Sequence, residues 1–471
     1  MENNIKKKRS SPGTLTILAA IVLVIAIASY LVPNVTRASF SDFITSPVKG
    51  FADSMSLCFY LFIFGGFLEE TKKTGVLEKG IDFLIRKLKG NELILIPILM
   101  FVFSIGGTTH GSLEETVGFY AIISAAMVAA GFDTVVSSAV VLLGAGSGTL
   151  GSTVNPFAVG TALGALPKGV TANNSIIIGL GTVLWLSTLG ISIFFVMRYA
   201  KKVKKEKGST LLSGMEWKNM EEFYGSSSQN EGRKEAINLT FREKISLFIF
   251  FITFLIMAAG FIPWQDFGVT FFSGWSKWLT GTEMGTWFFN EASVLFLVMA
   301  IIMAFIGRLK EKEITDAFVT GAAGMMNVAL VIILARASSV LLEETKLDMW
   351  ILNHSASLLS GTSPIVFTIL AFILYCLLSF VIPSSSGLAS VSMPIMGGLA
   401  DKLGLSVEIV IMVFVAANGL INLFTPTCGA IMGGLALAKV EYTTWLKFAK
   451  KIIITIGAVC VVILTVAMQI F

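Results

Sequence analysis

The chain uses one sequence design twice, once in each half. Leu68–Lys72 reads LEETK, and Leu342–Lys346 repeats the same letters. In each half the apolar sequence that follows is interrupted by small and polar residues, at Gly106–Leu113 and at Ile382–Leu388. Interrupted apolar segments at corresponding positions of two halves are typical of secondary transporters, which bind their solute between the two repeats. This pairing constrains the fold more than any other feature of the sequence.

A second pair of interruptions follows in the same order, at Gly151–Pro156 and at Leu420–Pro426. Proline removes a helical hydrogen bond. Non-helical backbone survives inside a bilayer only where protein or a wet cavity satisfies its polar groups. The alternative is a packing kink at which small residues let helices approach closely. Because the four breaks form two matching pairs, we favour a binding site.

Composition indicates a membrane protein. Apolar residues make up 55% of the chain, charged residues 14%, and the mean hydropathy is +0.81. Apolar runs long enough to cross a hydrocarbon layer of ~30 Å recur along the whole chain. The first run, 13–33, is long enough to be a retained span rather than a signal peptide. We expect an all-α polytopic membrane protein, an inverted-repeat secondary transporter with two re-entrant hairpins and two broken helices.

Basic clusters such as Lys6–Arg9 and Arg198–Lys207 orient the chain, because cytoplasmic segments of membrane proteins are rich in Lys and Arg. With the clusters inside, the chain has nine full spans and two hairpins, and the second half lies upside down relative to the first. Two ordinary spans in place of the first hairpin would give the same orientation, so that alternative stays open. Residues 201–243 are polar, and we expect a solvated linker there.

These considerations give a plan of the chain in the bacterial plasma membrane, with the N-terminus in the cytoplasm and the C-terminus outside. The expected divisions are 1–50 for the cytoplasmic N-terminus and first span, 51–198 for repeat 1 with its hairpin at 91–130 and broken helix at 134–166, 199–243 for the cytoplasmic linker, 244–318 for additional scaffold spans, and 319–471 for repeat 2 with its hairpin at 364–402 and broken helix at 406–438.

The breaks carry hydroxyls, amides and freed carbonyls, which suit Na⁺ or a polar solute. Helix N-termini that begin after a break can hold a carboxylate. The expected substrate- or ion-binding residues at the breaks and hairpins are Thr108, Thr109, Glu114, Glu115, Ser147, Thr149, Ser152, Thr153, Asn155, Ser384, Ser385, Ser386, Asn418, Asn422, Thr425 and Thr427.

Charged residues within apolar sequence are the sharpest of these candidates. Glu114 and Glu115 follow the first break, and an ionisable residue at membrane depth costs roughly 2.5–3.5 kcal/mol even on the mildest scale. Adjacent helical residues point about 100° apart, so we expect only one of the two to face the cavity. The alternative is an acidic helix N-terminus at the interface. Arg336 could pair with a Glu, bind a substrate carboxylate, or extend towards the membrane surface.

Other function classes find little support in the sequence. The four cysteines sit singly in apolar segments without metal or redox spacing, and the two histidines lie far apart. We therefore expect no enzyme, no cofactor, and no metal beyond Na⁺. The expected coupling ion is Na⁺ or H⁺. The expected partners are a small-molecule substrate, the lipid bilayer and a second copy in a homodimer, with no nucleic acid.

The chain resembles bacterial carriers of the ion transporter superfamily, and most closely the four-carbon dicarboxylate anaerobic carriers, a family that includes arginine/ornithine exchangers. The resemblance covers nearly the whole chain and implies a scaffold, a mobile transport domain with elevator-type alternating access, and often a dimer. Sodium-coupled dicarboxylate relatives carry Ser-Asn-Thr triplets at the hairpin tips, where this chain has Gly107–Thr109 and Ser384–Ser386. The motifs that carry the resemblance are Phe64–Gly66, Glu114–Thr116 with Phe119–Tyr120, Leu142–Gly146 with Asn155–Phe157, and Pro383–Gly387.

We therefore expect a plasma-membrane secondary transporter for an amino acid, with basic amino acids preferred and exchange of the arginine/ornithine type. Glu114 and Glu115 suit a cationic solute, whereas Arg336 alone would have to balance both carboxylates of a dicarboxylate. The alternative is a four-carbon dicarboxylate carrier coupled to Na⁺ or H⁺, with helix N-termini supplying positive potential. A membrane-embedded enzyme is the remote alternative.

Overall fold

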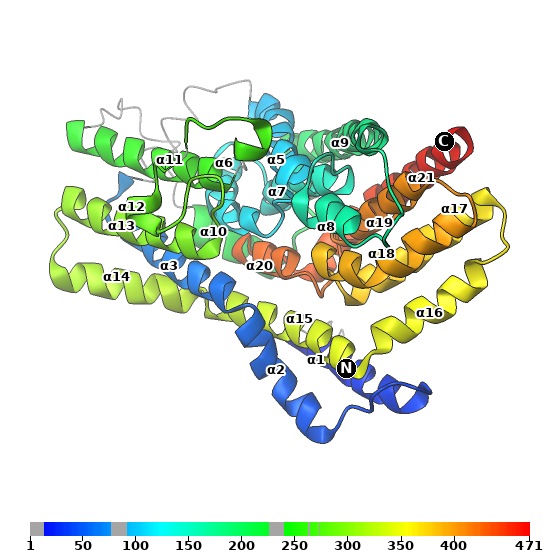
Figure 1. Cartoon of the computed structure of the whole chain (residues 1–471). Coiled ribbons are helices and arrows are strands. Elements are labelled where there is room, and N and C mark those ends of the chain that lie inside the picture. The colour runs from blue at the N-terminus through cyan, green and yellow to red at the C-terminus, as the bar shows by residue number, and fades with distance from the viewer. Residues whose placement is uncertain (1–13, 77–91, 226–239, 262–263, 273) are drawn as a thin grey trace, which may run out of the picture.

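The computed structural model describes residues 14–76, 92–225, 240–261, 264–272 and 274–471 (Figure 1). The Lys6–Arg9 cluster and residues 226–239 of the expected linker lie outside these ranges. All regular elements within them are helical. The α-helices are α1 (Thr14–Leu31), α2 (Phe40–Asp53), α3 (Met55–Lys73), α5 (Leu95–His110), α6 (Tyr120–Ala129), α7 (Thr134–Leu150), α8 (Thr161–Gly164), α9 (Asn174–Lys205), α10 (Gly214–Tyr224), α11 (Phe241–Phe261), α12 (Lys277–Thr280), α13 (Phe289–Gly307), α14 (Glu311–Gly324), α15 (Met326–Thr345), α16 (Leu347–Leu359), α17 (Pro364–Val381), α18 (Ser385–Lys402), α19 (Val407–Ile421), α20 (Gly429–Leu437) and α21 (Tyr442–Ile470).

Length and composition mark several of these helices as candidate membrane spans. In the described part of the chain six helical stretches are long and apolar enough to cross a bilayer, or seven if the bent pair α2 and α3 counts as one span. Helices α1, α6, α7 and α19 are apolar but shorter. The expected count of nine full spans and two hairpins stays a prediction.

Two consecutive helix pairs, α2–α3 and α14–α15, pack against each other across the two halves of the chain. Helices α2 and α3 meet at 62°; α2 packs on α15, and α3 packs on α14 (Figure 1). Gly50 lies against Ala337, and Gly65 lies against Gly321, so residue numbers rise along one pair as they fall along the other. The two pairs are therefore antiparallel. The expected boundaries at 51 and 319 fall inside α2 and α14.

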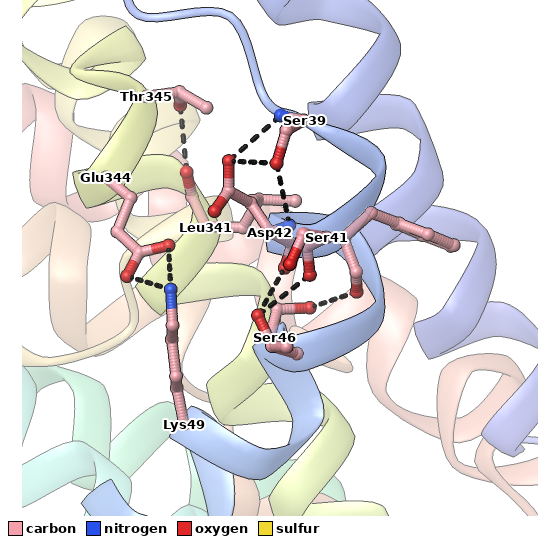
Figure 2. A network of polar contacts seen from close by, with 10 residues as sticks. Ser39, Ser41, Asp42, Ser46, Lys49, Leu341, Glu344 and Thr345 are labelled. Carbon is pink, nitrogen blue, oxygen red and sulfur yellow. Dashed lines mark hydrogen bonds and ion pairs between the residues drawn. The ribbon is translucent and has the colours of Figure 1, made fainter.

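Polar contacts tie α2 to α15 at one end of this assembly (Figure 2). Ser39 caps α2 through a capping box with Asp42. Lys49 reaches across to Glu344, with Nζ 2.6 Å from Oε1. Both side chains of this pair are exposed, so the pair adds little stability. The close backbone approach at the glycines holds the helices together more effectively.

The two expected broken helices form the centre of the molecule. Helix α7 lies between α5 and α9, and α19 lies between α17 and α21, with α7 and α19 in contact (Figure 1). Every residue of α19 except Glu408 is buried, and so is nearly all of α7. Both helices end at their Gly-, Asn- and Pro-containing breaks. Helix α7 is followed by Gly151–Asn155 and a short π-helix at Pro156–Gly160, and α19 by residues 422–428.

The two helical hairpins differ at their tips. In the second, α17 and α18 are joined at residues 382–384, as the sequence suggests. In the first, α5 runs on through Thr108 and Thr109 to His110, and its C-cap is Gly111, whose φ of 75° is left-handed. The expectation of a polar tip at Gly106–Leu113 was therefore wrong in detail, because Thr108 and Thr109 lie in the last turn of α5.

The expectation of a solvated linker at 201–243 was also wrong in the part that the structure describes. Helix α9 continues to Lys205, and α10 packs against α6. Glu216, Met220 and Tyr224 recur every four residues, so they share one helix face, and all three are buried. The Tyr224 hydroxyl donates a 2.6 Å hydrogen bond to the carbonyl of Leu437.

Glu216 joins α10 to the start of α21. Its carboxylate accepts hydrogen bonds from the backbone N–H of Ser213 (2.7 Å), from that of Glu441 (2.8 Å), and from the hydroxyl of Thr444 (3.0 Å). One buried carboxylate therefore satisfies donors at the N-termini of two helices, which favour negative charge. The sequence gives little sign of this helix, because a single short amphipathic face gives a weak periodic signal.

The Gly65–Gly321 contact predicts a sharp difference between two glycines of α14. A methyl group on Gly321 would strike the carbonyl of Gly65, whereas Gly324 faces open space. We expect Gly321→Ala to destabilise the protein by about 1–3 kcal/mol, since backbone cannot easily move aside. Gly324→Ala should leave stability unchanged or raise it slightly. Thermal unfolding in detergent measures both, and equal melting temperatures would contradict the antiparallel crossing.

Replacing Glu216 tests the docking of α10. In Glu216→Ala the N–H of Glu441 and the hydroxyl of Thr444 lose their partner, which should cost about 1–3 kcal/mol. Glu222→Ala removes an exposed carboxylate from the same helix and serves as the matched control. The melting temperature should fall for the first variant only. A solvated linker would show no difference between the two.

Candidate functional site

Thr108, in the last turn of α5, satisfies backbone groups at the first break. The Thr108 hydroxyl donates to the carbonyl of Gly151 (2.9 Å), and the backbone N–H of Thr153 donates to the carbonyl of Thr108 (2.9 Å). Asn155 caps the helix beyond the break, because its Oδ1 accepts from the N–H groups of Phe157 and Ala158. The backbone polar groups at this break are therefore hydrogen-bonded within the protein.

Side-chain amides and hydroxyls satisfy the backbone at the second break. Asn422 Nδ2 donates to the carbonyl of Pro383 at 2.8 Å, and Asn418 Nδ2 lies 3.4 Å from the same oxygen. Thr425 and Thr427 both donate to the carbonyl of Phe380, at 3.1 and 2.6 Å. The second hairpin tip is thereby fixed to the second broken helix.

The two breaks meet at the centre of the molecule. A Cβ placed on Gly146 would strike Leu423, and one placed on Gly419 would strike the backbone of Leu150. At Gly419 the obstacle is backbone, so only glycine permits the approach, whereas at Gly146 it is the flexible end of the Leu423 side chain. The interruptions are therefore adjacent in space, although about half the chain separates them in sequence.

A cavity of about 200 Å³ lies where the breaks and hairpins converge. Both hairpin turns, both broken helices, α13 and α15 contribute to its wall. The lining residues are Gly111, Leu113, Glu114, Thr149, Asn155, Phe157, Ala158, Phe288, Phe289, Arg336, Pro383, Ser384, Ser385, Ser386, Val415, Asn418, Asn422 and Cys428.

Arg336 and Glu114 face each other in the cavity wall. Nη2 of Arg336 lies 2.8 Å from Oε1 of Glu114, which comes from the turn after α5. Nε of Arg336 lies 3.8 Å from Oδ2 of Asp53, at the end of α2. The side chains of Arg336 and Glu114 are 21% and 34% exposed, so solvent screens the pair only in part. Two carboxylates thus surround one guanidinium, which leaves this cluster a formal charge of −1.

Asn422, one of the lining residues, has an unused acceptor. Its Oδ1 is buried and has no hydrogen-bond partner, although its Nδ2 is bonded. A buried acceptor without a partner is costly, so a donor on a bound solute would be favoured there. Nearby, α18 begins at the cavity with Ser384 as its N-cap, and its first N–H groups give positive potential.

The structure divides the predicted site residues into two groups. Glu114, Thr149, Asn155, Ser384, Ser385, Ser386, Asn418, Asn422 and Arg336 line the cavity. The others that can be placed are Thr108, Thr109, Ser147, Ser152, Thr153, Thr425 and Thr427, none of which is among the lining residues.

The hydroxyls of this second group bond to the protein itself. The Ser147 hydroxyl donates to the carbonyl of Leu143 in its own helix and lies 3.1 Å from the hydroxyl of Ser192 on α9. The Thr109 hydroxyl donates to the carbonyl of Ile105, one turn earlier in α5. The Ser152 hydroxyl accepts a hydrogen bond from the side-chain amide of Asn155. The side chain of Glu115 lies outside the described atoms, so the expectation that only one of the two glutamates faces the cavity stays a prediction.

Several cavity residues were not predicted from the sequence. Phe157 and Phe288 meet edge to face with ring centroids 5.6 Å apart, and Phe289 lies beside them in the lining. Asp53, which approaches Arg336 but does not line the cavity, was also missed, because nothing in its local sequence relates it to Arg336. Cys428 lines the cavity as a single thiol. Among the described residues no group of three or more His, Cys, Asp or Glu side chains could hold a metal ion.

Comparison with known proteins identifies the family. The model of the C4-dicarboxylate anaerobic carrier family matches residues 15–470. An uncharacterized protein of Haemophilus influenzae is 30% identical over 426 residues, covering 90% of this chain and 78% of the relative. The putative basic amino acid antiporter YfcC of Escherichia coli is 26% identical over 408 residues, covering 84% and 74%.

Two solved transporters align with the chain at low similarity. The YdaH transporter of Alcanivorax borkumensis is 14% identical with a TM-score of 0.42, covering 97% of this chain and 98% of that one. MtrF of Neisseria gonorrhoeae, described as an antimetabolite efflux pump, is 14% identical with a TM-score of 0.41, covering 97% and 95%.

The family model spans nearly the whole chain, and the described part holds six or more apolar helices long enough to cross a bilayer. Together these findings make the chain a multi-pass membrane carrier rather than an enzyme. The chain belongs to the C4-dicarboxylate anaerobic carrier family.

Proposed function

We propose that this carrier exchanges basic amino acids across the bacterial plasma membrane by alternating access. The observation that carries the proposal is the charge of the cavity wall. Arg336 can receive an α-carboxylate, and Glu114 can receive a cationic group. An amino acid presents both charges to one site, and the name of the YfcC relative is consistent with such a substrate.

Charge balance favours a basic amino acid over a dicarboxylate. Arg336 with Glu114 and Asp53 carries a formal −1, which a basic amino acid of net charge +1 would neutralise. A dianion would raise the local charge to −3 in a partly buried site, where like charges repel strongly. The unpaired oxygen of Asn422 also calls for a donor, which an ammonium or guanidinium group supplies.

The Arg336–Glu114 pair further favours exchange over free uptake. It joins α15 to the first hairpin, two segments 222 residues apart in sequence. In the empty carrier each charge satisfies the other and holds these segments together. A substrate that bonds to both groups replaces the pair and releases the hairpin. Return of the empty carrier would then be slow, so that a second substrate is needed for the return step.

The mechanism rests on an inverted-repeat architecture. In support, α2–α3 and α14–α15 run antiparallel, and hairpin, broken helix and long terminal helix follow in the same order in both halves. In transporters of this kind one unit moves against the other around a site near the bilayer midplane. We propose elevator-type movement of the hairpins and broken helices, with Na⁺ or H⁺ as a coupling ion if exchange is not strict.

The second candidate function is transport of a four-carbon dicarboxylate coupled to Na⁺ or H⁺, which the family description supports. In that case Arg336 and the N-terminus of α18 would supply the positive potential for the two carboxylates. The two candidates predict opposite responses to neutralising Glu114.

Transport by proteoliposomes separates the candidates. Vesicles loaded with ornithine should take up labelled arginine, and empty vesicles should take up little. Labelled succinate and fumarate serve as the competing substrates. No arginine exchange together with robust succinate or fumarate uptake would reject the proposed function in favour of the dicarboxylate carrier.

Neutralising Glu114 predicts a change of opposite sign for the two solute classes. Glu114→Gln removes one charge-assisted partner of a cationic solute, which should raise the Kd for arginine about 10- to 100-fold. A dianion should bind equally well or better, because Arg336 is freed. The matched control, Glu344→Gln, breaks the exposed pair with Lys49 and should change neither. Thermal-shift titration measures the affinities, and parallel losses for both solutes would contradict the charge argument.

A second pair of variants tests where the structure places the site. Asn422→Ala removes the unpaired acceptor together with the amide bond to Pro383 that holds the second hairpin, and should raise the Kd for arginine by about 3- to 10-fold. Ser147→Ala alters a residue that sequence alone assigns to the site but that points at α9, and its Kd should not change. Equal effects on substrate affinity would argue against the cavity.

A further inference from the structure

An apolar groove runs along the flank of the molecule away from the candidate site. Its volume is about 570 Å³, and α17, the end of α19 and α21 form its walls. Gly457 and Ala458 form a stretch of small residues on α21, and Leu377 and Ile454 in its wall are 63% and 71% exposed. The full lining is Phe372, Ile373, Cys376, Leu377, Leu420, Ile421, Phe424, Ile453, Ile454, Gly457, Ala458 and Val461.

The groove continues into a second hollow whose largely apolar wall includes two lysines. This hollow, of about 420 Å³, shares Phe424, Ile453 and Ile454 with the groove and adds Lys447 and Lys450. In the part of the chain that the structure describes, neither lysine takes part in an ion pair. Both are exposed. The apolar groove thus ends at two lysines that form no ion pair with the described residues.

The dimensions of the groove match one leaflet of a membrane. Lys450 and Val461 lie eleven residues apart on one continuous helix, which at 1.5 Å per residue is about 16 Å. Half of a ~30 Å hydrocarbon layer is about 15 Å. The lysines therefore lie at headgroup level when the apolar groove spans one leaflet.

The neighbouring helix places the same end of α21 at a membrane surface. The basic end of α9 lies beside it, with the rings of Tyr199 and Phe448 5.1 Å apart. Lys201, Lys202, Lys204 and Lys205 follow Tyr199 on α9. Basic clusters on two adjacent helices at the same depth mark the face that meets anionic headgroups.

We propose that this groove is a binding site for one anionic phospholipid. An acyl chain lies against Gly457, Ala458 and Leu377. The phosphate forms ion pairs with the ammonium groups of Lys447 and Lys450. A second copy of the chain fits less well. In a twofold dimer about the membrane normal, the same lysines of both copies would lie at equal depth and face each other. Their repulsion has no acidic counterpart in the groove lining.

The lipid site adjoins the second helix break. Phe424 lines the groove, and Asn422, two residues earlier, lines the central cavity. Helix α21 holds the intervening backbone, because Trp445 Nε1 donates to the carbonyl of Leu423 (2.9 Å) and the Tyr442 hydroxyl to that of Phe424 (2.8 Å). A lipid in the groove therefore braces the outer side of the backbone that shapes the cavity.

Binding is tested on the full-length protein in neutral detergent, with phosphatidylglycerol and phosphatidylcholine of identical acyl chains as probes. Native mass spectrometry counts retained lipid, and thermal unfolding measures stabilisation. We expect phosphatidylglycerol to be retained and to raise the Tm more than phosphatidylcholine. The double variant Lys447→Gln/Lys450→Gln should weaken phosphatidylglycerol binding at least about tenfold.

Matched variants separate the groove from general surface charge. Lys168→Gln/Lys402→Gln removes two exposed lysines elsewhere and should leave binding unchanged. Ala458→Trp fills the groove with both lysines intact and should abolish retention, whereas Val462→Trp, at a 63% exposed position outside the lining, should not. Equal responses to the two lipids, an unaffected Lys447→Gln/Lys450→Gln variant, or a dimer that Ala458→Trp dissociates would each overturn the proposal.

Discussion

The structure depends on hydrogen bonds that satisfy backbone carbonyls where two central helices are broken. Inside a bilayer no water is available to do this, and each unsatisfied group costs several kcal/mol. Thr108 bonds to Gly151 at the first break, and the amide of Asn422 bonds to Pro383 at the second. Both donors connect a hairpin to a broken helix. The same bonds that permit the breaks therefore fix the hairpins around the cavity.

Much of the architecture could be predicted because its signals are local. Glycine, proline and asparagine mark breaks wherever they interrupt apolar sequence, and the matched order of four breaks indicated a shared centre. Gly146 and Gly419 then bring the two breaks into contact. The family was also recognisable from short motifs, and the match over residues 15–470 confirms it.

Other features depend on long-range geometry that sequence does not carry. Thr108 and Thr149 are similar in kind and context, yet only Thr149 lines the cavity, because helix rotation decides which hydroxyl faces inwards. Asp53 approaches Arg336 only through the packing of α2 on α15. Helix α10 was taken for solvated linker because one short buried face resembles ordinary polar sequence. The sequence therefore did not predict how each helix is rotated about its axis, how distant helices align against each other, or which short polar segments bury one face.

The charge of the Arg336, Glu114 and Asp53 cluster has an electrical consequence. Moving one elementary charge through 100 mV is worth about 2.3 kcal/mol. In the proposed movement only Glu114 of this cluster travels with the hairpin, and a bound monovalent cation balances its formal −1, so the loaded unit would cross without net charge. Swapping one such cation for another would then be electrically silent, and only concentration gradients would set its direction. Swapping a basic for a neutral amino acid would instead couple the flux to the membrane potential.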